Sequence, residues 1–499
     1  MSSAPERPAS RLAAGWPRLA LVVLSGALWG WTFGRQPLPY LAIVALVPWL
    51  AVLPGRRAGF LGWLHGFVAW MVALPWIAPT LTTFGEIPPP LAWPLLALLA
   101  SYLALYHGVF AFLARRWWGS PFAGFTLPAL WVVLEWLRTY LGGGFPWNLA
   151  AYAWTDLPGA LPIAAWIGAY GVSCLILAVN VALALALRRA RPAFAGGALG
   201  LVLIVVLLGP RLAAGPAVEA GRPVALVQPN IGNQVEPDWG LIQRQYGELL
   251  ALSRQACDQP GTLVVWPESA GWPRVYAQDA GFAADLEALA AAGCPVVFNS
   301  LHPVSQTYYN SLYLMASDGA VERYDKRHLV PFGEYVPFAG VFAFIDGLAR
   351  NAGALAAADE IRLLAWGEDR LGVAICFEVV FPQEVAATVA AGASILVSVT
   401  NDAWYGDTSA PWQHLRAARF RAAENRRYLL RAAITGVSAV IAPDGSVVAS
   451  LGIDERGLVR SRVVGRSDRS PFSRAPWAIP ILCSGLTLFA MLGSPGRKP

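Results

Sequence analysis

Charge is scarce in this chain of 499 residues. Charged residues make up only 14% of it and hydrophobic residues 56%, whereas soluble domains usually carry roughly 25% charged residues. The formal net charge of +6 is modest for this length. The sequence shows no basic cluster combined with a nucleic-acid recognition motif, so we expect no nucleic-acid partner. Much of the chain must instead avoid water.

Cysteine and histidine are also sparse. The five cysteines, at positions 174, 257, 294, 376 and 483, form no Cys-x-x-Cys pair and show no zinc-ligand spacing. An odd and scattered set argues against a disulfide framework and leaves a free thiol available for chemistry. His328 and His414 have no partners at ligand spacing, which predicts structural or solvent-exposed roles and no metal site.

Long apolar runs and 22 tryptophans dominate the rest of the composition, and tryptophan favours the bilayer interface. The apolar segments lie at 17–34, 38–54, 59–79, 90–114, 121–141, 160–187, 193–213 and 476–493. Most have the roughly 20 residues that cross ~30 Å of hydrocarbon, although the second is short. The first is followed at once by further apolar segments, which favours an uncleaved span over a signal peptide. We therefore predict a polytopic α-helical membrane protein with eight spans.

Arginine placement predicts the orientation of these spans. If eight spans alternate, one side collects Arg7, Arg11, Arg56, Arg57, Arg115, Arg116, Arg188, Arg189, Arg191, Arg497 and Lys498. The opposite side has little beyond Arg35 and Arg138 in its short connections. By the positive-inside rule, both termini are cytoplasmic and the polar region before the last span lies outside the cytoplasm.

The polar region 222–470 has a different pattern. Short buried-type strands are predicted at 224–228, 262–266, 295–298, 372–376 and 394–399, and helices at 239–256, 280–292, 381–391 and 411–431. Asp-Gly pairs at 318–319 and 444–445 predict hairpins. The alternation predicts a layered α/β domain of about 250 residues. The expected organisation is a cytoplasmic tail at 1–16, a seven-helix membrane domain at 17–214, this domain at 222–470 and a C-terminal transmembrane helix at 474–494.

Reactive side chains follow the predicted strands. Glu268 comes just after one strand, Lys326 and Glu334 lie in a loop entered from a hairpin strand, and Cys376 ends another strand. A cysteine at a strand end is more often a small core residue than a nucleophile, and Glu268 and Lys326 could each be surface charges. Together, however, the three residue types make a complete acyl-transfer site. Glu268 would take the thiol proton, and Lys326 would stabilise the oxyanion, with the backbone N–H of Phe377 as a second donor.

Sequence motifs around these residues resemble a known family. Trp266-Pro-Glu268, Tyr324-Asp-Lys326 and Cys376-Phe-Glu378, in this order, resemble the nitrilase superfamily with its Glu-Lys-Cys triad. The continuous stretches 324–337 and 400–406 resemble the apolipoprotein N-acyltransferases in particular. In the apolar half, Glu135-Trp-Leu-Arg138 and Gly144-Phe-Pro-Trp147 do so as well.

The resemblance implies an eight-span membrane protein with an extracytoplasmic αββα nitrilase-like domain inserted before the last span. It also implies site residues. Glu268, Lys326 and Cys376 match the triad, Glu334 and Glu378 match two auxiliary acids, Asn310 matches an asparagine near the site, and Trp404 matches a residue lining the acyl or lipid path. Trp239 matches a tryptophan that contacts substrate, across a loop that is spaced differently here. Phe377 stands where relatives often have tyrosine.

The implied reaction is a two-step acyl transfer at the periplasmic side of a bacterial inner membrane. Cys376 would take a fatty acyl chain from a phospholipid as a thioester and pass it to the N-terminal amine of a diacylglyceryl-cysteine on an apolipoprotein. No metal or organic cofactor is required, and all the catalytic residues lie in one chain, which favours a functional monomer. One alternative is a membrane-tethered amidase or nitrile hydrolase with water as acceptor. Another is a transporter or scaffold whose outer domain only binds.

Three smaller features leave alternatives open. Glu135 and Arg138 lie one helical turn apart in the fifth span, where charge indicates either a functional site or a mutual pair that fixes helix packing. The arginines of 416–431 indicate a solvated helix face or internal ion pairs rather than a lipid-phosphate site. The Ala/Gly-rich stretch 338–360 is a candidate gate over the site.

Overall fold

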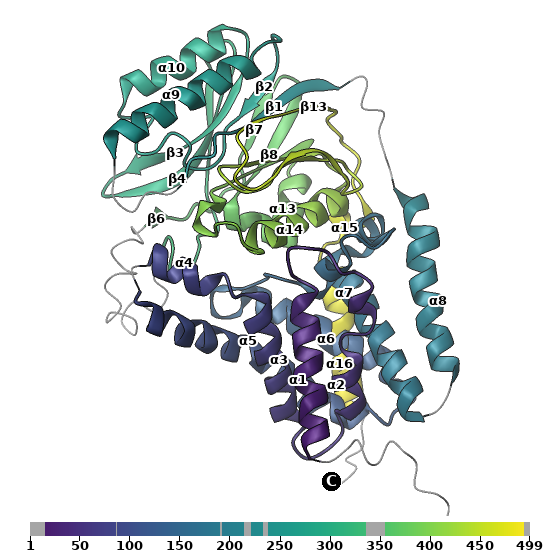
Figure 1. Cartoon of the computed structure of the whole chain (residues 1–499). Helices are drawn as coiled ribbons and strands as arrows, with labels where there is room; N and C mark the ends of the chain where they lie inside the picture. The colour runs from purple at the N-terminus through teal and green to yellow at the C-terminus, as the bar shows by residue number, and fades with distance from the viewer. Residues whose placement is uncertain are drawn as a thin grey trace, which may run out of the picture. The chain divides into compact units, whose positions relative to one another are not determined.

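The computed structural model describes residues 15–85, 87–189, 192–213, 221–232, 238–335 and 355–493. The chain divides into two compact units. The first, which we call the helical unit, comprises Met1–Ala78, Pro90–Leu212 and Trp477–Pro499. The second, the strand unit, comprises Pro79–Pro89 and Ala213–Pro476 (Figure 1).

Helices make up the described part of the helical unit. They are α1 (Trp16–Trp31), α2 (Val47–Val52), α3 (Ala58–Ala73), α5 (Pro89–Trp117), α6 (Ala123–Tyr140), α7 (Ala160–Arg189), α8 (Pro192–Leu208) and α16 (Ala478–Leu492). Helix α1 packs on α3, α6 packs on both α7 and α16, and α7 packs on α8. A short helix, α4 (Ile77–Thr83), crosses the boundary into the strand unit.

Three described helices are long and apolar enough to cross a membrane, namely Pro89–Trp117, Ala160–Arg188 and Pro192–Leu212. The bent pair of α3 and α4 would make a fourth. The apolar segment 38–54 is not one helix, because a 3-10 turn at Leu41–Ile43 is followed by α2, which Pro48 opens in its first turn. The helical half is that of a membrane protein, while the count of eight spans and their orientation stay predictions.

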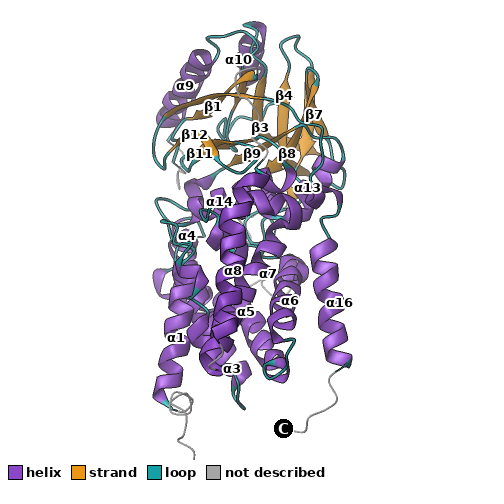
Figure 2. Cartoon of the chain, turned by 90° about the vertical axis from the view of Figure 1, so that its right-hand side faces the viewer, coloured by secondary structure: helices purple, strands orange, loops and turns teal. Residues whose placement is uncertain are grey.

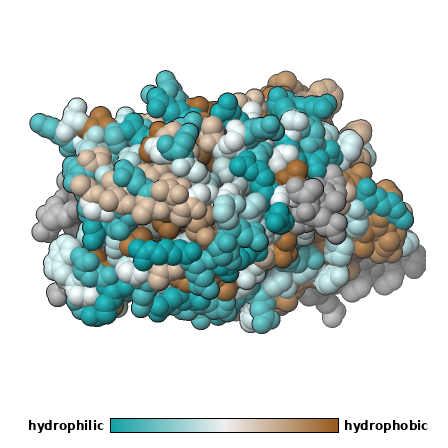
Figure 3. All heavy atoms as spheres, turned by 90° about the horizontal axis from the view of Figure 1, so that it is seen from above, coloured by the Kyte–Doolittle hydropathy of each residue, from teal (hydrophilic) through white to brown (hydrophobic). Residues whose placement is uncertain are grey.

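Large apolar side chains are exposed on two of these helices. Leu199, Leu203 and Leu207 are exposed on α8, and Ile481, Leu482 and Phe489 are exposed on α16. Contiguous exposed apolar surface of this kind is typical of a face that contacts lipid or another apolar partner. Figure 3 shows a different face, on which hydrophilic residues predominate and hydrophobic ones form separate patches.

Two glycines on α1 allow the backbones of α1 and α3 to approach closely. A Cβ added at Gly26 would lie 2.6 Å from the carbonyl oxygen of His65. A Cβ added at Gly30 would lie 2.4 Å from the carbonyl oxygen of Ala69. Because the two glycines are four residues apart, they lie on the same face of α1, as small residues do where membrane helices pack tightly.

Two sheets form the strand unit (Figure 2). The first sheet has the order β13-β1-β2-β3-β4-β5, with β6 beside β4, and the second has the order β12-β11-β10-β9-β8-β7. The strands of the first are β1 (Arg222–Gln228), β2 (Leu263–Val265), β3 (Val296–Val304), β4 (Thr307–Met315), β5 (Val321–Asp325), β6 (Leu355–Ala356) and β13 (Gly457–Val463). Those of the second are β7 (Leu363–Trp366), β8 (Asp369–Ile375), β9 (Ile395–Thr400), β10 (Leu429–Ala433), β11 (Ser438–Ile441) and β12 (Val447–Leu451).

The sheets form the middle of an αββα sandwich. Val224 and Leu226 on β1 belong to the core shared by the two sheets, whereas the alternate residues Ala225 and Val227 belong to a core with helices. Helices α9 (Trp239–Ala256) and α10 (Ala280–Ala291) cover the first sheet. Helices α13 (Pro382–Ala390) and α14 (Ala410–Asn425) pack on the second. The fold class predicted for this half is confirmed.

Most predicted strand-unit elements are confirmed, but the helix predicted at 411–431 is wrong at its end. Helix α14 stops at Asn425, because Arg426 adopts the left-handed conformation, and β10 follows. The expectation from the cysteine pattern also needs correction. Cys257 and Cys294 form a disulfide that joins the end of α9 to the residues before β3, at a separation of 37 residues.

Candidate active site

Cys376 is the first residue after β8, which lies between β9 and the edge strand β7 in the second sheet. It begins a 3-10 turn, Cys376–Val380, and has a φ of +52°, a left-handed conformation that non-glycine residues rarely adopt. The turn is closed by Glu378, whose Oε2 accepts a hydrogen bond from the backbone N–H of Ile375 at 2.7 Å. The strand end therefore presents the thiol on a sharp turn, with the side chain 7% exposed.

Glu268 lies just beyond β2 in the first sheet and is buried. Its Oε1 accepts a hydrogen bond from the Asn310 amide at 2.9 Å, and its Oε2 accepts one from the backbone N–H of Asn401 at 2.9 Å. The same Oε1 lies 3.9 Å from Nζ of Lys326. Both carboxylate oxygens are therefore held in place.

Lys326 follows β5 directly and its side chain is 1% exposed. Its Nζ lies 2.8 Å from the Glu334 carboxylate, and the Asn310 amide donates to the same carboxylate at 3.0 Å. Because Asn310 and Lys326 each contact both Glu268 and Glu334, the four side chains form one closed polar cluster.

Glu378 joins the residues after Lys326 to the turn at Cys376. Its Oε1 accepts hydrogen bonds from the hydroxyl of Tyr324 at 2.8 Å and from the backbone N–H groups of Arg327 at 2.7 Å and His328 at 3.1 Å. Its other oxygen holds the N–H of the residue before Cys376. One buried carboxylate thus ties a loop of the first sheet to a turn of the second.

Burial and neighbouring charge set the protonation of the cluster. Burial raises the pKa of Glu268, even though the Lys326 ammonium opposes the shift. Burial lowers the pKa of Lys326, but the carboxylates of Glu334 and Glu268 outweigh it, and the pKa is raised. Burial, and then the charge of Glu268, raise the pKa of the Cys376 thiol. The resting site therefore holds a neutral thiol beside an ammonium and a carboxylate of raised basicity, which is a base suited to removing the thiol proton.

Cys376 also contacts a second buried cluster of polar residues, which was not predicted from the sequence. Oγ1 of Thr400 lies 3.4 Å from Sγ of Cys376 and 2.8 Å from Oδ1 of Asp402. Arg431 donates to Oδ2 of Asp402 at 2.7 Å. His414 lies 3.2 Å from Asp402 through Nδ1 and 3.1 Å from the carbonyl oxygen of Cys376 through Nε2. The available signals were the motif 400–406, which contains Thr400 and Asp402, and the open option of internal ion pairs for the arginines of 416–431.

Two earlier alternatives are resolved by these contacts. His414 is fully buried, which agrees with the structural role predicted as one of its two alternatives. His328 is partly buried, and its Nδ1 lies 2.9 Å from the Glu384 carboxylate. Arg421 and Arg431 are buried in internal ion pairs, with Glu424 at 2.6 Å and Asp402 at 2.7 Å. This is the internal ion-pair option predicted for the arginines of 416–431.

The remaining predicted site residues differ in their surroundings. Phe377 is buried and packs on Phe381, with ring centroids 5.1 Å apart. Trp404 is 43% exposed, and its ring meets that of Phe84 at 4.7 Å in an edge-to-face contact. Trp239, the first residue of α9, is 63% exposed, and no hydrogen bond or ring contact joins it to the triad among the described residues.

Most of the stretch proposed as a gate, together with much of the differently spaced loop before Trp239, lies outside the described residues. Among the residues that are described, no group of three histidine, cysteine, aspartate or glutamate side chains could hold a metal ion.

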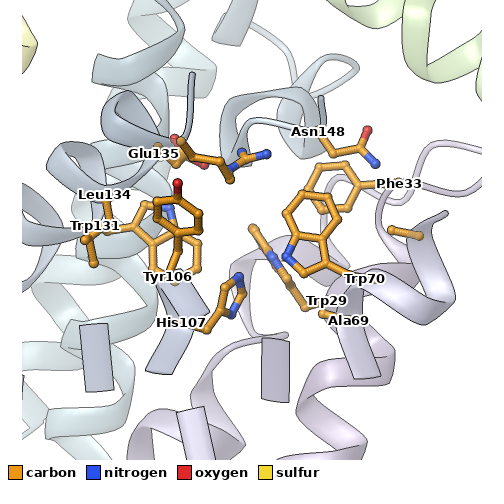
Figure 4. Close-up of a pocket in the computed structure, with 13 residues that line it drawn as sticks. Trp29, Phe33, Ala69, Trp70, Tyr106, His107, Trp131, Leu134, Glu135 and Asn148 are labelled. Atoms are coloured by element: carbon orange, nitrogen blue, oxygen red, sulfur yellow. The ribbon is translucent and has the colours of Figure 1, made fainter. Parts of the chain in front are cut away.

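In the helical unit, Glu135 and Arg138 each form hydrogen bonds with backbone groups. Arg138 donates to the carbonyl oxygens of Phe145 at 2.6 Å and Trp147 at 2.8 Å, and Glu135 accepts from the backbone N–H of Ala150 at 2.7 Å. Both line a small cavity of about 30 Å³ together with aromatic residues and Asn148 (Figure 4). That volume has room for about two water molecules.

The chain matches two known families. Residues 25–182 match the apolipoprotein N-acyltransferase N-terminal domain, and residues 223–464 match the carbon-nitrogen hydrolase family. The apolipoprotein N-acyltransferase of Geobacter metallireducens is 37% identical over 450 residues, covering 86% of this chain and 85% of the relative. That of Pseudomonas paraeruginosa is 33% identical over 510 residues and covers 96% of both chains.

Among solved structures, an amidase of the nitrilase superfamily from Nesterenkonia AN1 is 22% identical to this chain with a TM-score of 0.39. The match covers 50% of this chain and 93% of the amidase. Glu268, Lys326 and Cys376 all lie within the carbon-nitrogen hydrolase match, and Glu135 and Arg138 lie within the N-terminal match. With relatives of this identity along most of its length, the chain belongs to the apolipoprotein N-acyltransferase family.

Proposed function

We propose that this acyltransferase moves a fatty acyl chain from a membrane phospholipid to the N-terminal amine of a diacylglyceryl-cysteine on an apolipoprotein, with Cys376 as the carrier. The observation that carries the proposal is the cluster of Glu268, Lys326 and Glu334, in which the charges of Glu268 and Lys326 act on the buried Cys376 thiol. A base, a cation and a thiol in one dry site are the parts of a covalent acyl transfer.

In the first half-reaction, Glu268 takes the thiol proton and the Cys376 sulfur attacks the carbonyl carbon of the phospholipid ester. Lys326 and the backbone N–H of Phe377 stabilise the oxyanion, and loss of one such donor typically costs about 3–4 kcal/mol of transition-state stabilisation. The tetrahedral intermediate collapses when the ester C–O bond breaks. Protonated Glu268 then returns its proton to the leaving alkoxide, which releases a lysophospholipid and leaves a thioester on the sulfur.

In the second half-reaction, the amine of the lipoprotein attacks the thioester carbonyl. Glu268 removes a proton from the attacking nitrogen, the C–S bond breaks, and Glu268 passes that proton to the departing Cys376 thiolate as the amide product leaves. Asn310 and Glu334 position Glu268 and Lys326 in both steps through the contacts described above. The side chain of Trp404, exposed and in contact with Phe84, would line the acyl path, and Trp239 would contact substrate.

Two observations support a location of the strand unit outside the cytoplasm, on the periplasmic side of the inner membrane. The arginine distribution favours cytoplasmic termini. The disulfide between Cys257 and Cys294 is a bond that persists in an oxidising compartment such as the periplasm. Since one chain supplies every proposed catalytic residue, a monomer suffices for the chemistry.

Intact-mass measurement after incubation with phospholipid tests the carrier role. The expected result is an adduct of one acyl chain that is removed by hydroxylamine, is absent in Cys376→Ser, and is consumed when a diacylglyceryl-cysteine peptide is added. The peptide should gain the same acyl chain on its amine.

Two results would contradict the proposal. Undiminished N-acylation by Cys376→Ala would show that Cys376 is not the nucleophile. Release of free fatty acid at an unchanged rate in the presence of the acceptor peptide, without its acylation, would indicate a hydrolase with water as acceptor.

A further inference from the structure

Thr400 and Cys376 lie side by side at the ends of neighbouring parallel strands. The register pairs Ile375 at the end of β8 with Val399 on β9, so the residue after each of these lies at the same edge of the second sheet. Oγ1 of Thr400 is fully buried and lies 3.4 Å from the Cys376 sulfur. It is therefore in contact with the proposed reacting atom.

The Thr400 hydroxyl has one proton and two neighbours that can accept it. Oδ1 of Asp402 lies 2.8 Å from Oγ1, closer than the sulfur. Burial would raise the pKa of Asp402, but the charge of Arg431 outweighs burial and lowers the pKa to about 2, so Asp402 is a carboxylate. A carboxylate is a stronger acceptor than a neutral thiol, so in the resting site the hydroxyl donates to Asp402. The thiol S–H can then donate to a lone pair of Oγ1.

This arrangement reverses when the thiol loses its proton. A thiolate can only accept hydrogen bonds, and the hydroxyl of Thr400 lies 3.4 Å from the sulfur. Asp402 can release the hydroxyl because Arg431 still donates to its other oxygen at 2.7 Å. Rotation about the Cα–Cβ or C–O bond of Thr400 is enough to redirect the proton, and no covalent bond changes.

The backbone of Cys376 is fixed while this happens. The carbonyl oxygen of Cys376 can only accept, so we assign a proton to Nε2 of His414, which lies 3.1 Å away. Arg431 donates to Nδ1 of His414 at 3.2 Å, which is consistent with that tautomer. His414 is thus a positioning residue that holds the peptide of a nucleophile whose φ is +52°.

We propose that Thr400 is a further catalytic residue, whose hydroxyl turns from Asp402 to the Cys376 thiolate and stabilises the anion each time it forms. The inference rests on the proposed function, because it takes Cys376 as the nucleophile. The Cys376 proton goes to Glu268, as above, and Thr400 keeps its own proton throughout. The other charged or titratable groups that act on the sulfur are Glu268, Lys326, Asp402 and Tyr405.

Thiol alkylation by iodoacetamide in the purified full chain tests this without any lipid substrate. Thr400→Val keeps the shape and removes the hydroxyl, whereas Thr400→Ser keeps the hydroxyl. Peptide mass identifies the alkylated Cys376. At pH values below the thiol pKa, we expect its alkylation rate to be about tenfold lower in Thr400→Val than in the parent. The increase of the rate with pH should then occur roughly one pH unit higher. Thr400→Ser should stay within about twofold of the parent, which is the rescue that a role in shape alone would not give.

The outcomes separate this inference from the proposed function. An alkylation profile that is the same in Thr400→Val and the parent, in a chain where Cys376→Ser abolishes acyl transfer, would overturn the role of Thr400 alone. Acyl transfer that survives in Cys376→Ser would overturn the proposed function, whatever the alkylation result. A cooperative thermal transition checks folding of each variant. If Thr400→Val does not fold, the comparison of Thr400→Ser with Thr400→Ala decides by the same criterion.

Discussion

Asn310 lies between two carboxylates and gives one amide hydrogen bond to each. Its bond to Glu268 favours the charged form and therefore lowers the pKa of that base, against the larger effect of burial. In Asn310→Ala, the pKa of Glu268 should rise, and the acid limb of the pH profile of kcat/KM for N-acylation should move to higher pH. At neutral pH, we expect a loss of about tenfold or more.

A matched control is Asn230→Ala, because the Asn230 side chain donates to the carbonyl oxygen of Asp454 at 2.7 Å and has no contact with the cluster among the described residues. Its profile should match that of the parent. An acid limb that stays in place in Asn310→Ala would mean that Asn310 does not adjust the proposed base.

Asp402 offers a test of stability at the same scale. Its pKa is lowered to about 2, so it stabilises the fold above its ordinary pKa of 3.8, and this contribution is lost as the pH falls through about 2. Asp402→Asn leaves the buried guanidinium of Arg431 without its carboxylate, which should lower the free energy of unfolding by about 3–5 kcal/mol at neutral pH.

Chemical denaturation of the detergent-solubilised protein measures this loss. Glu360→Gln is the control, since it removes an exposed partner of Arg362 and should change stability by no more than about 1 kcal/mol. Equal effects of the two substitutions would show that the buried pair contributes nothing beyond a surface pair.

At the scale of elements, the disulfide links the end of α9 to the start of β3. A bond that closes a loop of this size stabilises a fold by about 3–4 kcal/mol in the chain-entropy description. The double substitution Cys257→Ala and Cys294→Ala should therefore lower Tm measurably while leaving the alkylation rate of Cys376 close to that of the parent. An unchanged Tm would show that the two thiols are not joined in the folded protein.

The close packing of α1 on α3 gives a second prediction at this scale. In Gly30→Ala, the new methyl group meets the Ala69 carbonyl, so the helices must separate and Tm should fall. The control is Gly197→Ala on α8, where an added Cβ meets nothing within 4 Å and alanine should stabilise the helix by up to about 1 kcal/mol. Opposite signs in thermal unfolding are expected, and a rise in both would contradict the close approach.

The sequence predicted best those elements in which apolar residues repeat with one clear periodicity. Helix α9 has the predicted bounds because its apolar face repeats at helical spacing between Asp238, which caps it, and Cys257. Strand β10 was missed because arginine is usually a surface residue, and the burial of Arg431 depends on an ion pair with Asp402, which is distant in the sequence.

The same limit applied to the site. Glu268, Lys326 and Cys376 follow predicted strands, but their chemistry and position alone left core or surface roles open, and the resemblance to the nitrilase superfamily is what proposed them as a triad. Thr400 was part of a recognised motif, but its side chain acquires a role only through a 3.4 Å contact between neighbouring strands, and strand pairing is not visible in a sequence read alone. The disulfide was missed for the same reason, since 37 residues separate its cysteines.

At the scale of the whole molecule, the prediction concerns sidedness. Asp318 lies exposed in the β4–β5 turn, and Arg57 lies exposed just before α3. In intact cells with a permeabilised outer membrane, a membrane-impermeant maleimide should label Asp318→Cys and not Arg57→Cys, relative to the parent chain. Detergent should expose both, and labelling of Arg57→Cys alone before detergent would reverse the proposed orientation.

The residues of the proposed site are divided between two sheets, which has a consequence for how the gene can recombine. Glu268, Asn310 and Lys326 follow or lie on strands of the first sheet, whereas Cys376 and Thr400 belong to the second. Recombination that exchanges one sheet between relatives would pair the proposed base of one lineage with the proposed nucleophile of another. Such a chimera retains chemistry only where the four hydrogen bonds of Glu378 still join the two parts. Because neither sheet carries all the residues of the proposed site, we expect the two sheets to be inherited together.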